Sequence, residues 1–82
     1  MNKNELVHLH SLLSLVARTY LDDGIASRGD FAAYHALETT PMALRRSRED
    51  HAAATRTLAR TLARRANGEP VAADEVSVLA EQ

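Results

Sequence analysis

Two stretches of the chain carry apolar residues at helical spacing, and each places a histidine where a leucine is expected. His10 stands four positions after Leu6 and three before Leu13. His51 stands seven positions before Leu58. Because residues three, four or seven positions apart share one face of an α-helix, the pattern predicts two long helices. Each would carry a titratable, metal-capable group on its apolar face.

The chain is short, and its apolar residues are small. With 82 residues it is one domain, of a size that buries only about 60% of the surface exposed by its unfolded chain. Of its 37 hydrophobic residues, 15 are alanine, which gains little on burial compared with leucine. No cysteine is present to form a disulfide. We therefore expect a homodimer, with a second copy covering spare apolar residues such as Leu12 and Leu15.

The first helix is predicted from about Lys3 to Leu21. Asn2 precedes it and Glu5 follows three positions later, which is typical of a capping box. Gly24 is a plausible stop signal.

A short second helix is predicted over Phe31–Glu38, with Asp30 as its N-cap. The third helix is predicted over Pro41–Ala66, with Thr40 as its N-cap and proline at the first helical position. A second cap at Ser47 would instead divide this stretch into a short and a long piece. Continuity is favoured by the sevenfold spacing that begins at Leu44.

These elements predict an all-α, three-helix domain in which two long antiparallel helices are joined through a short one. The domain would span residues 1–68. Residues 69–82 would form a tail, either mobile or folded into a weak last helix.

The stripe histidines support two interpretations. In the first they are core or interface residues, hydrogen-bonded to Ser14 and Thr55, each four positions further along, and burial would keep them neutral. In the second, His10 and His51 bind zinc or another transition metal, and a two-fold dimer would supply four imidazoles. His8 lies about 200° around the helix from His10, so we do not expect it to share that site.

No catalytic constellation is recognisable. The sequence has no glycine-rich phosphate loop, no cysteine nucleophile and no serine in a nucleophile-elbow context. His35 is expected at or near the surface. These observations predict a protein that is not an enzyme.

Positive charge gathers in the third predicted helix. Residues 44–66 hold seven arginines against two acidic residues. Such a face is either solvated or able to follow a phosphate backbone, which makes nucleic-acid association the alternative function. The arginines that would carry it are Arg45, Arg46, Arg56, Arg60 and Arg64.

The segments ELVHLHSLL (residues 5–13) and SREDHAAA (residues 47–54) resemble archaeal uncharacterised protein family 0058. The resemblance runs to about Leu62. It implies a compact all-helical domain of unassigned activity, with a tentative metal-binding role in some members. The motif falls on Glu5, His8, His10, Asp50 and His51, whereas Arg45 and Arg46 stand where the family pattern has a basic-and-histidine patch.

Location and role follow as expectations. No apolar run approaches the ~18 residues of a membrane span, and the N-terminus lacks a signal-peptide pattern, so we expect a cytoplasmic protein. The leading hypothesis is a small binding or interaction module centred on His10 and His51. The sequence does not identify a small-molecule ligand for it.

Overall fold

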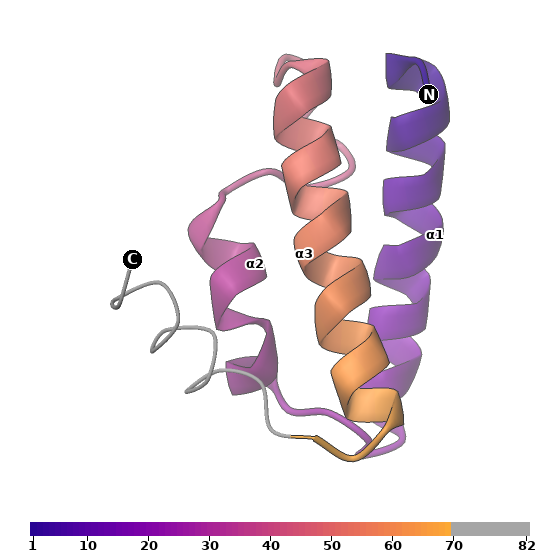
Figure 1. Cartoon of the computed structure of the whole chain (residues 1–82), viewed down its shortest axis with the longest axis vertical. Coiled ribbons are helices and arrows are strands. Elements are labelled where there is room, and N and C mark those ends of the chain that lie inside the picture. The colour runs from indigo at the N-terminus through magenta and orange to yellow at the C-terminus, as the bar shows by residue number, and fades with distance from the viewer. Residues whose placement is uncertain (70–82) are drawn as a thin grey trace.

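The computed structural model describes residues 1–69, which form three α-helices and one short 3-10 helix (Figure 1). Helix α1 spans Lys3–Asp22, and α3 spans Arg48–Ala66. Between them lie η1 (Arg28–Phe31) and α2 (Ala32–Ala36). No strand occurs in residues 1–69. The predicted all-α architecture, two long helices with a short helix between, is confirmed.

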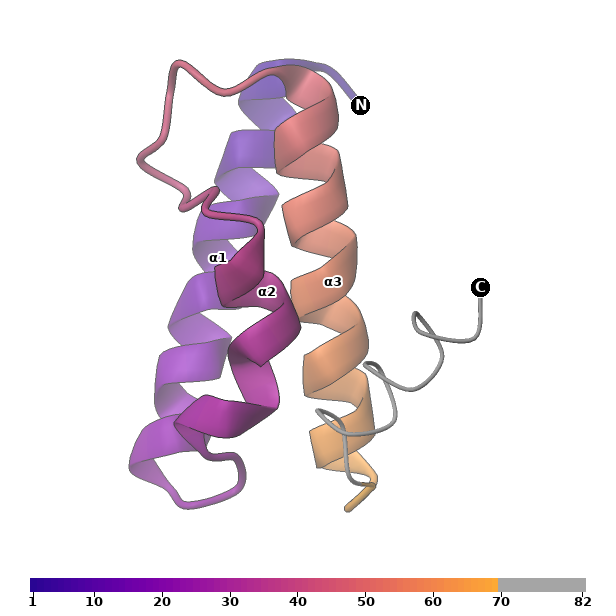
Figure 2. The ribbon, with the colours of Figure 1, turned by 90° about the vertical axis from the view of Figure 1, so that its left-hand side faces the viewer.

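The two long helices run parallel, so the antiparallel prediction is wrong. Near the start of each helix, His10 contacts His51. Near their ends, Arg65 donates to the carbonyl of Ile25. The separation in sequence is 41 at the first contact and 40 at the second, as parallel packing requires. Helix α2 runs the opposite way and returns the chain to the end where α1 begins (Figures 1 and 2).

Capping boxes begin both long helices. Asn2 and Glu5 cap α1 as predicted, each side chain accepting from the other residue's backbone N–H. Ser47 and Asp50 form the same reciprocal pair at α3. The predicted start of the third helix at Pro41 is therefore wrong: residues 37–47 contain turns, and α3 begins only where the box satisfies its first N–H groups.

The short helix also begins differently from the prediction. Asp30 lies inside η1, where its carboxylate accepts from the N–H and the hydroxyl of Ser27. Ser27 is therefore the N-cap, and Asp30 is not. The helix ends at Ala36, before Glu38 at φ 52°, a left-handed conformation that a helix cannot continue through.

The core lies where α1, η1 and α3 meet. It contains five buried residues, with Leu13, Tyr20, Leu21 and Tyr34 packed against it; the five are Ala17, Ala26, Phe31, Leu58 and Leu62. Leu44 is 59% exposed because it precedes α3, so the sevenfold stripe begins at His51. No helix in residues 1–69 is long and apolar enough to cross a membrane. The predicted tail lies outside the described residues from position 70 onward.

Candidate functional site: a buried histidine pair

The packing of α1 on α3 brings His10 and His51 into contact. Both side chains have 0% exposure, and their Nδ1 atoms lie 3.2 Å apart. The rings meet edge to face, with centroids 5.4 Å apart. The chain thus places two polar groups at the centre of an interface that leucines could fill.

One arrangement of protons satisfies all four ring nitrogens with both rings neutral. The Ala43 carbonyl can only accept, so His51 Nε2–H donates to it over 2.9 Å. His51 Nδ1 then accepts from His10 Nδ1–H. His10 Nε2 must accept in turn, and the Tyr34 hydroxyl donates to it over 2.7 Å. The hydrogen bonds therefore run in one direction, from α2 through α1 to α3 and on to the turn before α3.

Ser14 adds a further side-chain hydrogen bond to this series, because it is hydrogen-bonded to Tyr34. The expected local partners are thus replaced. Ser14 reaches Tyr34 instead of His10, whose two nitrogens are already engaged. The Thr55 hydroxyl is buried without a hydrogen-bond partner among the described residues. Tyr34 was missed as a partner because nothing in its sequence spacing connects it to His10.

The surroundings of His10 favour its neutral state. Burial lowers the pKa of His10 below its ordinary value of 6.5, and the neighbouring His51 lowers it further. Burial raises the pKa of Tyr34 above its ordinary value of 10.0, an effect opposed by the hydrogen bond with Ser14. Both pKa shifts favour the uncharged forms of His10 and Tyr34 at neutral pH.

The pair meets one requirement of a zinc site and lacks the others. Two nitrogens on tetrahedral zinc lie about 3.3–3.4 Å apart, given Zn–N bonds of about 2.0–2.1 Å, which is close to the observed 3.2 Å. However, no group of three His, Cys, Asp or Glu side chains within residues 1–69 could hold a metal. Because both histidines are fully buried, a second copy cannot add its own imidazoles unless the helices separate. The described residues do not fit a zinc ion.

The other residues of the two motifs have structural roles or lie apart from the pair. Glu5 and Asp50 belong to the capping boxes of α1 and α3. His8 is exposed on the outer side of α1, where it lines a shallow hollow with Leu9 and Leu12. His35 is exposed on α2 beside Tyr34.

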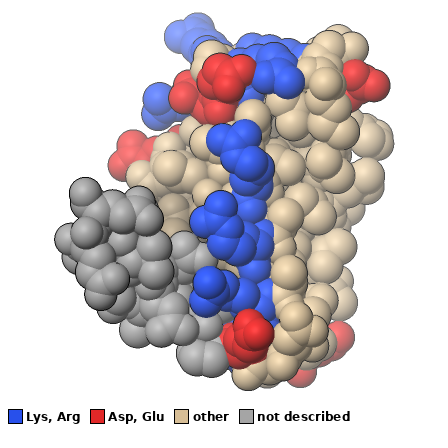
Figure 3. All heavy atoms as spheres, in the orientation of Figure 1, with Lys and Arg blue, Asp and Glu red and all other residues tan. Residues whose placement is uncertain are grey.

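The arginines form a column along α3 and a group at its start (Figure 3). The column consists of Arg56, Arg60 and Arg64, spaced four residues apart on the side away from the core. Arg45 and Arg46 lie exposed in the turns before α3. Two further arginines contact other segments of the chain. Arg48 donates to the Met1 carbonyl, and Arg65 forms an ion pair with Asp30 at 3.5 Å.

The fold and its site define a small all-helical protein built around a buried, hydrogen-bonded histidine pair. The chain belongs to the Uncharacterised protein family UPF0058, whose family model matches residues 1–79. No curated protein and no solved structure matches it. The family match agrees with the resemblance carried by the two histidine-containing motifs, and it supplies no activity.

Proposed function

We propose that this protein is a non-enzymatic helical interaction module that forms a homodimer through the outer face of α1. The observation that carries the proposal is a set of large apolar side chains left uncovered on that helix. Leu12 is 48% exposed, Leu15 66% and Val16 40%. A contiguous exposed apolar surface of this kind is typical of a protein interaction site.

The spacing of this face suits another helix. Leu9, Leu12 and Val16 are separated by three and four positions, the alternation found where two helices pack along a seam. Residues 6–17 contain no Lys, Arg, Asp or Glu. The surface on the α1 side of the molecule carries few charged residues in the face that Figure 3 shows. An uncharged strip pairs with an identical strip without placing like charges together, which favours a second copy as the occupant.

The histidine pair supports a structural role within this module. Both rings are inaccessible, and all four of their nitrogens are hydrogen-bonded. A polar contact inside an apolar helix interface can select one register, because any slip leaves polar groups buried and unpaired. We infer that the pair fixes how α3 lies on α1 and so shapes the surface that α1 presents.

The dimer is tested by changing Leu12 and Leu15 together to glutamate. Sedimentation of the unchanged protein at low micromolar concentration is expected to give twice the chain mass of 9.0 kDa. The double variant is expected to give a folded monomer, because burying two carboxylates in the interface on the outer face of α1 is too costly. Met42→Glu, at an 80% exposed apolar residue outside the helices, is the control and should remain dimeric. A folded monomer of the unchanged protein would reject the proposal.

A second candidate function, nucleic-acid association, is favoured by the arginine column of α3. Successive members lie about 6 Å apart along the helix, from four residues at 1.5 Å each. The column lies on the surface along the second half of α3 (Figure 3), as contact with consecutive phosphates requires.

The test is the salt dependence of binding to duplex DNA. If the column binds phosphates, Arg56→Glu combined with Arg60→Glu should weaken binding and reduce the slope of log K against log salt by about 0.9 for each lost contact. Arg28→Glu, at an exposed arginine in η1, is the matched charge control. This candidate function would be rejected if Arg28→Glu weakened DNA binding as much as the Arg56 and Arg60 changes do. It would also be rejected if the unchanged protein had no affinity for duplex DNA at low salt.

A further inference from the structure

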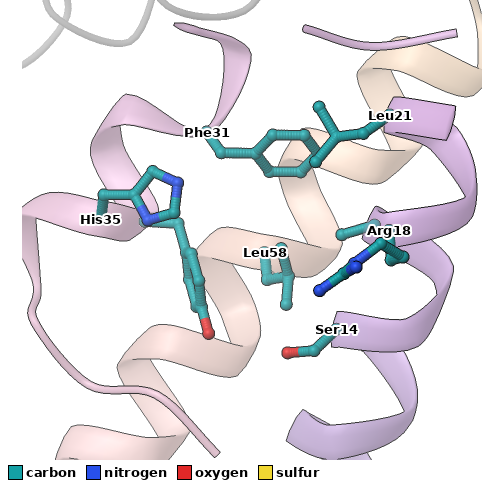
Figure 4. Close-up of a pocket in the computed structure, with 8 residues that line it drawn as sticks. Ser14, Arg18, Leu21, Phe31, His35 and Leu58 are labelled. Carbon is teal, nitrogen blue, oxygen red and sulfur yellow. The ribbon is translucent and has the colours of Figure 1, made fainter. Parts of the chain in front are cut away.

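A small apolar pocket lies between α1 and α2, with α3 as its floor (Figure 4). It exists because α2 packs against η1 and α3 more than against α1. Its volume is about 160 Å³. The walls are Ala17 and Leu21 from α1 and Phe31 from η1, and Leu58 closes the bottom.

The size of the pocket limits what it can hold. A dry apolar cavity of about 150 Å³ in another protein holds a benzene molecule, so this pocket can hold one aromatic ring or a short branched chain. Its inner polar groups add no specificity, because Tyr34 already donates to His10 and is hydrogen-bonded to Ser14. The buried part of a ligand would therefore be apolar.

The mouth of the pocket has a different character. Arg18 and His35 both line the pocket, and Figure 4 shows the Arg18 side chain extending from α1 into the space between the helices. The same two residues and Leu21 also line an adjoining hollow, whose further lining includes Arg28, Ser27 and Asp22. The pocket itself is lined by one guanidinium group and one imidazole, and the adjoining hollow adds a second guanidinium group and one carboxylate.

We propose that this pocket binds a small apolar carboxylic acid. The ring or branched chain would lie against Phe31 and Leu58, and the carboxylate would remain at the mouth beside Arg18 and His35. A guanidinium presents paired N–H donors that match a carboxylate, and an apolar body with one charged end matches a pocket with one charged end.

The test uses phenylacetate as the probe and amide chemical shifts of the full chain as the readout. Phenylacetate is expected to shift Ala17, Phe31 and Leu58, with a Kd at or below about 1 mM. Arg18→Gln is expected to raise that Kd about three- to fivefold, a modest factor because the guanidinium is solvent-exposed. The Kd for 2-phenylethanol, which has the ring without the charge, should not change.

Arg56→Gln removes the same charge from the outer face of α3 and is the matched control; it should leave both Kd values unchanged. Absence of saturable shifts up to about 10 mM phenylacetate would overturn the proposal. It would also be overturned if Arg18→Gln and Arg56→Gln had equal effects, or if the shifts mapped to Leu9 and Leu12 on the outer side of α1.

Discussion

Replacing either buried histidine alone with leucine is expected to lower the free energy of unfolding by about 1–3 kcal/mol. His10→Leu removes the donor to His51 Nδ1 and leaves that nitrogen buried and unpaired. His51→Leu removes the acceptor of the His10 Nδ1–H and leaves that donor buried and unpaired. Leucine fills a similar volume, so the loss arises from the stranded polar group and not from a cavity. Chemical denaturation at fixed protein concentration measures it.

Replacing both histidines is expected to cost less than the two single changes added together. In the double variant, the two groups that were hydrogen-bonded to the imidazoles keep other partners. Tyr34 retains its hydrogen bond with Ser14. The Ala43 carbonyl still accepts from the Arg46 N–H at 3.1 Å. Removing both members of a buried polar contact can be nearly neutral when the substitutes are apolar and of similar shape.

The double-mutant cycle therefore isolates the coupling between the two rings. His8→Leu is the matched control, since it changes an exposed histidine on the same helix, and it should alter stability by no more than about 0.5 kcal/mol. Strict additivity of the two single losses would show that the rings do not stabilise each other and would remove the proposed role of the pair in fixing register.

Features set by neighbouring residues could be read from the sequence. The start of α1 follows from Asn2 and Glu5, whose side chains and backbones satisfy each other within one turn. The burial of His10 and His51 follows from helical periodicity alone. The same local logic favours Ser47 as a cap, whereas the sevenfold spacing of Leu44 from His51 favours an earlier start of the helix. Leu44 is in fact exposed and outside the helix.

Features that depend on how the helices meet could not be read in this way. The direction of α3 is set by the return of the chain through α2, a segment whose path no periodicity describes (Figure 2). Tyr34 reaches His10 across 24 residues, and Ala43 reaches His51 from a turn. A local rule offered Ser14 and Thr55 as partners because it considers only positions on the same helix. Tertiary packing provided different partners and left the Thr55 hydroxyl without one in the described part of the chain.

Acidification is expected to destabilise the protein through His10. In the folded state, burial and the neighbouring His51 hold the pKa of His10 below 6.5. In the unfolded chain the same imidazole has its ordinary value. Well above pH 6.5 this imidazole is neutral in both the folded and the unfolded state, so it gives stability no dependence on pH. As the pH falls below 6.5, the unfolded chain takes up a proton that the folded protein does not, and the free energy of unfolding decreases. The decrease ends once the pH is below the lowered pKa of the folded state.

The expected result is a fall in denaturation midpoint between pH 7 and pH 5, above the range in which ordinary carboxylates take up protons. The variant carrying both His10→Leu and His51→Leu should lose most of this dependence, because it has no buried imidazole to keep neutral. His8→Leu, which leaves the pair intact, should retain it. If the double variant lost stability with acid as steeply as the unchanged protein, the pair would not be the source. The hydrogen bonds of the pair are satisfied with both rings neutral, and no described carboxylate is hydrogen-bonded to either ring to offset an added charge. The contact that specifies how the helices pack should therefore also be the contact that acid weakens first.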